Sequence, residues 1–322
     1  MCKAMERANI LITGAAGLIG KSLINGLHKK EPLCHIIAVV HSMERAKNVL
    51  PDEPWITLVE ADVNDPLTVE GPVDYIVHGA SITSSKDFVQ IPADTIMTAV
   101  QGTRNLLELA REKQVKSFVY LSSMEVYGAP TTDDKIAEDA ACHLDTMQKR
   151  SSYPESKRLC ETMCAAYHAQ YGVPAKVVRL TQTFGPGIDY NDGRVFAEFA
   201  RCAIEKRDIV LHTKGLTRRA YLSTDDAVRA IVTVLLKGEN GVAYNAANES
   251  TYCSICEMAQ LVAKDICGGE ISVRIHEENI EKFGYAPELK MNLDTGRLKA
   301  LGWEAADSMI DMYRKLIISM KE

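Results

Sequence analysis

A tyrosine and a lysine stand four residues apart at Tyr153 and Lys157. On a helix this spacing puts both side chains on one face, one turn from each other. An ammonium group beside a phenol favours the phenolate, so such a pair can take a proton from a carbinol, or return it, near neutral pH. The same spacing also occurs on ordinary amphipathic helices. The segments that precede the pair must therefore decide its meaning.

Those segments alternate between short β-branched runs and amphipathic stretches. The pattern predicts strands at residues 9–13, 35–40, 56–60, 74–78, 117–121 and 176–180, and helices at 18–28, 94–113 and 153–171. Alternation of this kind predicts the α/β class, with a Rossmann-type, doubly wound parallel sheet. Such sheets bind ligands at the carboxyl ends of their strands. The Tyr153/Lys157 helix is therefore expected to start beside a ligand crevice.

A glycine-rich turn follows the first predicted strand. Three glycines spaced Gly-x-x-Gly-x-x-Gly between a strand and a helix let the backbone turn tightly and approach a pyrophosphate at the start of the helix. Small or acidic residues after the third and fourth strands would line the same site, although Asp62 could also be only a turn residue before Asn64-Asp65-Pro66. The predicted cofactor-binding residues of this region are Gly14, Gly17, Leu18, Ile19, Gly20, Asp62, Val63, Gly79, Ala80 and Ser81.

The second predicted strand ends where the adenosine ribose of a dinucleotide is expected. NAD sites usually place an acid there. This chain has His41 and Ser42, no carboxylate until Glu44, and then Arg45 and Lys47. Basic and hydroxyl groups suit the 2′-phosphate of NADP, so we predict NAD or NADP with a small preference for NADP, held by His41, Ser42 and Arg45. The alternative is that the two basic residues begin a solvated helix.

The ordered motifs resemble the extended short-chain dehydrogenase/reductases, the nucleotide-sugar epimerase/dehydratase family. The similarity runs from residue 9 to about residue 303 and includes the glycine-rich turn, Gly102-Thr-x-Asn-Leu-Leu107, Ser123 through Gly128, the Tyr153/Lys157 pair and Leu301-Gly-Trp303. The resemblance implies a bound NAD(P) that exchanges hydride with a carbon of a nucleoside-diphosphate sugar. It makes Tyr153 the acid/base on the hydroxyl at that carbon, and Ser123 a hydrogen-bond partner of the same oxygen. Lys157 would lower the pKa of the tyrosine and hold the nicotinamide ribose.

Glu125 bears on which reaction follows. The resemblance places it where dehydratases and uronate decarboxylases of the family carry an active-site glutamate, which can act as a base; the alternative is a glutamate that binds backbone beneath the sugar. Met124 stands where one common type of dehydratase has its leaving-group acid. Residues 79–85, 91–96 and 123–128 resemble the UDP-glucuronate decarboxylases, but Thr295 stands where those enzymes have an arginine, with Arg297 as a displaced candidate. Both departures weaken these two reactions as predictions.

The strand–helix alternation ends after Gly185-Pro-Gly187, and shorter elements follow. We expect residues 1–185 to form the dinucleotide-binding domain and residues 186–322 to form mainly a substrate-binding lobe, with about 219–250 returning to the main domain. The resemblance assigns Arg219 to the substrate diphosphate, to which a planar guanidinium is suited; the alternative is a solvated strand-edge arginine. The predicted substrate-binding residues are Ser81, Ser84, Gln182, Arg194 and Arg219.

Composition excludes several other classes of protein. The formal net charge of -6 gives no basic field for nucleic acid, and no apolar run is long enough to span a membrane. Nine cysteines are too sparse for a disulfide framework. Cys253 and Cys256 have zinc-like spacing but lack a second pair, and Ser254 with Glu257 better fits a helix capping box, so we predict no metal site.

We expect a cytoplasmic protein that forms a homodimer, the latter on family analogy alone. In relatives the helices that correspond to 94–113 and 153–171 pair with a second copy. The apolar positions that would serve, or that could instead be core, are Leu106, Leu107, Leu109, Met163 and Tyr167.

Epimerisation through a transient keto sugar is the leading prediction, because it needs only Tyr153, Lys157 and Ser123. An NADPH-dependent reductase of a keto sugar comes next, followed by a decarboxylase and a dehydratase. A non-catalytic NADP-sensing or scaffold protein is an alternative of a different class. The three intact catalytic-type residues argue against it.

Overall fold

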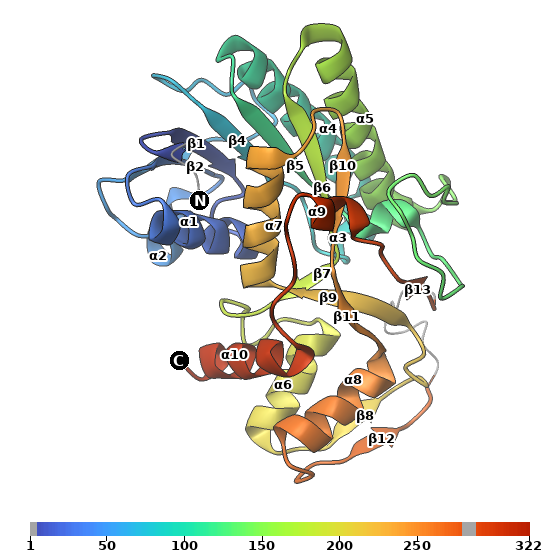
Figure 1. Cartoon of the computed structure of the whole chain (residues 1–322). Coiled ribbons are helices and arrows are strands. Elements are labelled where there is room, and N and C mark those ends of the chain that lie inside the picture. The colour runs from blue at the N-terminus through green and yellow to red at the C-terminus, as the bar shows by residue number, and fades with distance from the viewer. Residues whose placement is uncertain (1–4, 279–287) are drawn as a thin grey trace.

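The computed structural model describes residues 5–278 and 288–322 and has two lobes (Figure 1). The larger lobe is built on a seven-stranded sheet in which all neighbouring strands are parallel. Its strand order is β3 (Ile56–Glu60), β2 (His35–Val40), β1 (Asn9–Thr13), β4 (Tyr75–His78), β5 (Ser117–Ser123), β6 (Ala175–Leu180) and β10 (Ala243–Ala246). The predicted Rossmann-type fold is confirmed.

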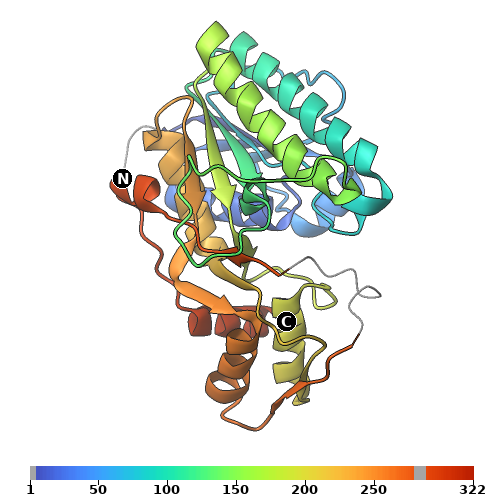
Figure 2. The same ribbon diagram turned by 90° about the vertical axis from the view of Figure 1, so that its right-hand side faces the viewer.

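Helices cover both faces of this sheet because its central strands are apolar on both sides. On one face Ile10 and Ile12 of β1 share a core with Leu23 of α1 (Leu18–Lys30) and Ile231 of α7 (Thr224–Lys237). On the other face Leu11 shares a core with residues of α4 (Pro92–Glu112) and α5 (Ser152–Tyr171), two helices that lie side by side in Figure 2. Successive side chains of a strand point to opposite faces, so one short apolar run supplies both cores.

Two short helices and two 3₁₀ turns lie in the connections between strands of this sheet. They are α2 (Met43–Val49), α3 (Asp87–Gln90), η2 (Met124–Tyr127) and η3 (Lys149–Ser151). The predicted strand at 74–78 begins one residue late, at Tyr75. The Asp74 carboxylate accepts the Asn9 N–H at 2.8 Å and pairs with Lys116 at 2.8 Å, directly before the strand.

The smaller lobe combines short strands with three helices. Strands β7 (Gln182–Phe184), β9 (Arg218–Ser223), β11 (Asn248–Ser254) and β13 (Lys290–Met291) form one sheet, and β8 (Ile209–Leu211) pairs with β12 (Val273–Ile275). Helices α6 (Val195–Glu205), α8 (Ile255–Leu261) and α10 (Met309–Lys321) enclose a core around Phe184. The capping box of Ser254 and Glu257 is confirmed, but the helix that it starts becomes a π-helical turn at Val262–Ile266.

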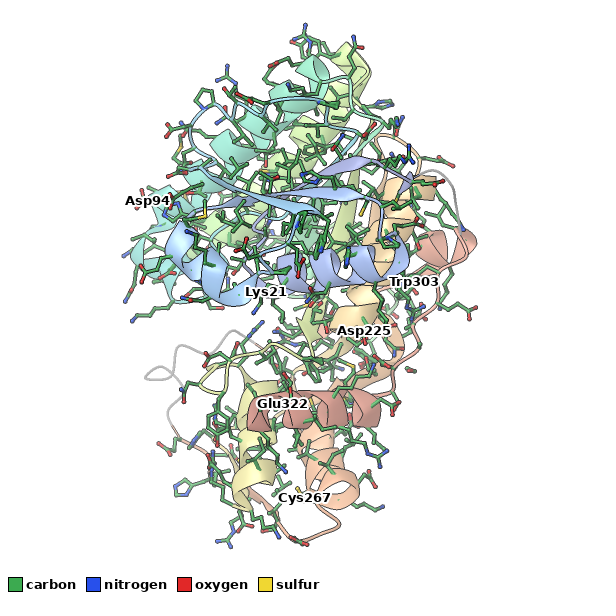
Figure 3. All side chains as sticks on the ribbon, turned by 90° about the vertical axis from the view of Figure 1, so that its left-hand side faces the viewer. Lys21, Asp94, Asp225, Cys267, Trp303 and Glu322 are labelled. Atoms are coloured by element: carbon green, nitrogen blue, oxygen red, sulfur yellow. The ribbon has the colours of Figure 1, made fainter. Side chains whose placement is uncertain are left out.

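The chain passes repeatedly between the two lobes. It leaves the main sheet after β6, returns with α7 and β10, leaves again with β11, and sends α9 (Gly296–Ala300) back against β10. Figure 3 shows Lys21 of α1 and Asp225 of α7 on the side of the larger lobe that faces the smaller one, with Cys267 far from both. Within the described ranges, no helix is both long and apolar enough to cross a membrane.

Candidate active site

The turn between β1 and α1 brings backbone close to backbone. Gly14 has φ +69°, and a Cβ on it would lie 2.9 Å from backbone atoms of Gly79 and Ala80 at the end of β4. A Cβ on Gly20 would collide with the backbone of Gly14 and Ala15. Helix α1 starts at Leu18 with no side-chain cap and no acid in its first turn. No side chain there therefore competes with a ligand for the first N–H groups of the helix. This cradle fits a pyrophosphate.

Thr13 ties the carboxyl ends of β1 and β4 together. Its hydroxyl oxygen accepts the N–H groups of Gly79 and Ala80, both at 3.1 Å, and the hydroxyl lies 2.7 Å from His78 Nδ1. Burial, reinforced by the charge of Lys157, lowers the pKa of His78 to about 3, so the ring is neutral and its Nδ1 accepts the Thr13 proton. His78 is therefore a fully buried packing residue at the carboxyl end of β4.

The four predicted catalytic residues meet where β5 ends and α5 begins. Ser123 is the last residue of β5, and its hydroxyl hydrogen-bonds Tyr153. Tyr153 and Lys157 are both buried on the first turns of α5. The Lys157 ammonium donates to the Leu121 carbonyl at 2.9 Å and lies 5.6 Å from the centre of the Tyr153 ring. The predicted helical spacing thus points both side chains at the end of β5.

Burial shifts the pKa values of both groups toward their neutral forms. It raises the pKa of Tyr153 well above 10, and the Glu125 carboxylate raises it further, whereas the Ser123 hydrogen bond and the Arg150 charge lower it. Burial also lowers the pKa of Lys157 to about 8. In this state the tyrosine holds its proton, and the lysine ammonium is one that gives up its proton in mildly basic solution.

Arg150 and Phe88 are parts of this site that the sequence analysis missed. The Arg150 guanidinium donates to both oxygens of Glu125, at 3.0 and 3.1 Å, and its central carbon lies 5.2 Å from the Phe88 ring centre. The Phe88 ring in turn stacks on Tyr153, 4.2 Å between centroids. Glu125 is therefore held in a two-pronged ion pair with an arginine that also contacts the ring stacked on Tyr153. The available signal was an arginine one helical turn before the tyrosine.

The predicted adenosine-binding residues are mostly engaged with their own backbone. One oxygen of Asp62 accepts both the N–H and the side-chain amide of Asn64, each at 2.9 Å, which is the turn role considered as its alternative. Next to it, the carbonyl of Val63 accepts the side-chain amide of Asn105 at 2.9 Å. The Ser42 hydroxyl caps α2 by accepting the Arg45 N–H at 3.3 Å. His41 and Arg45 are exposed.

On the smaller lobe, Arg219 has the surroundings that best fit the role that the resemblance assigns to it, binding of the substrate diphosphate. One of its terminal nitrogens donates to Gln182 at 3.3 Å, while its Nε is buried without a hydrogen-bond partner among the described residues. Arg194 instead pairs with Asp192 at 2.6 Å and lies 4.8 Å over the Phe196 ring. A buried N–H that lacks an acceptor is costly, so Arg219 is the stronger candidate for an anionic ligand.

The remaining predicted contacts are spread along the crevice. Ser81, three residues after the end of β4, is half-buried, and the Ser84 carbonyl accepts the N–H of Asp87 at the start of α3. Leu18 packs against the core of the smaller lobe, whereas Ile19 packs against the core of the sheet. Among the residues that the structure describes, no group of three or more metal-ligating side chains is gathered.

The two positions compared with the decarboxylase arginine have other partners. Thr295 is fully buried, and its hydroxyl bonds Glu249 at 2.5 Å. Arg297 lies 3.4 Å from Glu138. Thr295 carries no charge, and the Arg297 guanidinium already has a carboxylate partner. Neither position therefore offers an unpaired cation.

This geometry agrees with the comparisons with known proteins. The profile of the NAD dependent epimerase/dehydratase family matches residues 10–247. The chain belongs to this family. Its sequence is 34% identical over 275 residues to UDP-glucuronic acid decarboxylase 1 of Xenopus tropicalis. The aligned part covers 83% of this chain and 62% of that protein. The protein of the same name from Danio rerio is covered to 60%, so the chain spans about three-fifths of these relatives.

Two solved structures share the fold of this chain over nearly its whole length. UDP-glucose 4-epimerase of Thermotoga maritima, crystallised with UDP-glucose, superimposes with a TM-score of 0.81 at 22% identity, covering 97% of this chain and 98% of that one. The dTDP-glucose 4,6-dehydratase of Bacillus anthracis, in complex with NAD, gives 0.78 at 21% identity, with coverage of 98% and 96%. At such identities the likeness concerns the fold, and it extends to both lobes of this family member.

Proposed function

We propose that this chain epimerises a nucleoside-diphosphate sugar through a transient keto sugar, with NAD(P) held at the glycine-rich turn. When bound, the nicotinamide supplies reversible hydride acceptance. Tyr153 moves the proton at the sugar hydroxyl, Ser123 orients that oxygen, and Lys157 supplies the adjacent positive charge. Hydride would return to the opposite face of the carbonyl carbon while Tyr153 gives the proton back to the oxygen, so that the configuration of the carbon is inverted and no co-substrate is consumed.

The observation that carries this choice is the ion pair between Glu125 and Arg150. Both oxygens of the Glu125 carboxylate accept guanidinium N–H groups of Arg150, so the carboxylate is engaged in a two-pronged ion pair and not turned toward a sugar carbon. Dehydration would need an acid at the position of Met124, which instead lies buried 3.3 Å from the Thr181 hydroxyl. Hydride and proton transfer by Tyr153, Lys157 and Ser123 require neither group.

We further propose that Arg219 and Gln182 bind the diphosphate of the substrate. The unpartnered Nε of Arg219 supports this role, because a phosphate oxygen would satisfy it. UDP is the nucleotide of the named relatives and of the Thermotoga maritima complex, and it is the first to test. Arg194, exposed beside the same lobe, would contact the nucleotide after leaving Asp192.

UDP-glucuronate decarboxylation is the second candidate. The 34% identity to UDP-glucuronic acid decarboxylase 1 favours it, and Arg150 supplies a cation one turn before Tyr153 that a sugar carboxylate would share with Glu125. The partners found for Thr295 and Arg297 argue against it, since a second cation for the carboxylate is then missing at both compared positions.

One experiment separates these reactions. Purified protein is denatured to identify any released dinucleotide by mass spectrometry, and native protein is incubated with UDP-glucose, UDP-N-acetylglucosamine and UDP-glucuronate. We expect an epimer from one of these sugars, with no net change in absorbance at the reduced-nicotinamide band. Release of CO₂ from UDP-glucuronate would establish the decarboxylase instead. Stoichiometric consumption of added NADPH would establish a reductase, and a bound dinucleotide without turnover on any sugar would favour the sensor.

The assembly and location of the protein are also proposals. Leu106, Leu107 and Leu109 are core residues of the protomer, so a dimer through α4 and α5 would use other positions. The exposed apolar side chains that these helices offer are Ile96, Met97, Leu159 and Tyr171. Eight cysteines of the described ranges carry free thiols, which supports a reducing, cytoplasmic location.

A further inference from the structure

The adenosine end of the predicted cofactor site contains a carboxylate that the local sequence does not supply. Strand β2 ends at Val40, where the ribose of a dinucleotide is expected, and the residues that follow it include no acid before Glu44. Strand β3 lies beside β2 in parallel register, with Val40 opposite Glu60, its last residue. The neighbouring strand thus brings a glutamate to the position at which β2 lacks one.

The Glu60 side chain reaches across to the loop after β2. Its Oε1 accepts the N–H of Met43, the first residue of α2, at 2.7 Å. The Ala61 N–H, directly after Glu60, bonds the Val40 carbonyl at 3.0 Å and holds the two strand ends together. A carboxylate has two oxygens with several acceptor positions, so one can hold Met43 while the other accepts a ribose hydroxyl.

The groups that would favour a 2′-phosphate are less well arranged. The Ser42 hydroxyl is used to cap α2, and the side chains of Arg45 and Lys47 lie exposed on that helix together with the acidic Glu44. A phosphate carries between one and two negative charges near neutral pH, so a carboxylate at the same place repels it. The charge of Glu60 therefore opposes the preference for NADP that the sequence of this loop predicts.

We infer that Glu60 is a specificity-determining residue that selects NAD over NADP, replacing from β3 the acid that is absent after β2. The inference rests on the proposed nicotinamide-dependent function. In this arrangement the acid for the ribose hydroxyls comes from the end of β3 and not from the end of β2.

The test compares binding of the two reduced dinucleotides. Resident nucleotide is removed on charcoal, and the protein is titrated with NADH and with NADPH by nicotinamide fluorescence. We expect wild-type protein to bind NADH at least ten times more tightly than NADPH. Glu60→Gln, which removes the charge and keeps an acceptor, should reduce this ratio about tenfold, mainly by improving NADPH binding. Glu44→Gln removes a nearby exposed carboxylate and should leave the ratio unchanged.

Four results would count against the inference, and the last of them is distinguishable from the others. Wild-type protein that prefers NADPH, or an unchanged ratio in Glu60→Gln protein with a wild-type melting temperature, overturns the role of Glu60 alone. An equal loss of preference in Glu44→Gln shows a general field effect and overturns it as well. Failure of wild-type protein to bind either dinucleotide overturns the proposed function together with it.

Discussion

Replacement of Arg150 by glutamine tests whether the ion pair with Glu125 sets the proton affinity of the active site. Arg150 makes two charged hydrogen bonds to Glu125, at 3.0 and 3.1 Å. Hydrogen bonds to charged groups contribute about 1.5–3 kcal/mol each. The two side chains are 34% and 27% exposed, so solvent screening places the whole pair near the lower limit, at about 1.5 kcal/mol.

The same substitution acts on Tyr153. Glu125 raises the pKa of the phenol and Arg150 lowers it, so Arg150→Gln leaves the carboxylate unopposed and the pKa of Tyr153 rises. One pKa unit corresponds to about 1.4 kcal/mol, or a tenfold change in the fraction of phenolate. We therefore expect turnover at pH 7 to fall about tenfold, with the ascending, acidic limb of the pH–rate profile moved to higher pH.

The assay is a double-mutant cycle on Arg150→Gln, Glu125→Gln and the double variant. Urea unfolding gives the coupling in stability, and turnover of the identified sugar from pH 6 to 9 gives the coupling in catalysis. The double variant should recover most of the lost activity, because both charges are gone. Arg111→Gln, which removes an exposed arginine 3.7 Å from Glu108, is the control and should change neither quantity. If Glu125→Gln alone abolishes turnover while Arg150→Gln does not, Glu125 is a base and the reasoning is wrong.

Three further predictions follow from single side chains. Tyr153→Phe should lower turnover by a factor of about 10²–10⁴ while the dinucleotide stays bound, and full activity in that variant would remove Tyr153 from the mechanism. Gly14→Ala should weaken dinucleotide binding at least tenfold in fluorescence titrations and lower stability by about 1–3 kcal/mol, because φ is +69° and the new methyl group meets the Gly79 and Ala80 backbone. Burial lowers the pKa of Lys176 to about 8, below its unfolded value of about 10.4, so the unfolded state binds more protons between these values and the free energy of unfolding should rise from pH 8 to about 10. Lys176→Met should remove up to about 3 kcal/mol of that rise in urea titrations, and an unchanged slope would show that the ammonium is solvated.

The sequence was sufficient for the elements whose signal is local. The glycine spacing, the β-branched runs and the Tyr153/Lys157 spacing each depend on residues a few positions apart, and the main strands and helices agree with them. The loop after β2 marks a limit of such local signals. The Glu60 carboxylate, which accepts the Met43 N–H, comes near this loop only through the pairing of β2 with β3.

The ion pair at Glu125 was hidden for a related reason. Arg150 lies 25 residues further along the chain, in a 3₁₀ turn that has no amphipathic pattern of its own. Phe88 comes from a four-residue helix and reaches Tyr153 only because α3 packs on α5. Contacts across such distances depend on how the helices close over the sheet, which residue types and spacing do not encode directly.

The position of β10 has a consequence for how the protein is made. On the side away from β5, the neighbour of β6 is β10. Strand β10 begins at Ala243 and β6 ends at Leu180, so residues 181–242 must leave the ribosome in between. At about 5–20 residues per second this takes roughly 3–12 s. During that time the edge of β6 that faces away from β5 leaves its N–H and C=O groups unpaired and open to other nascent chains. Synthesis is thus a period of risk for aggregation, and early binding of a chaperone to this edge would protect the unfinished sheet.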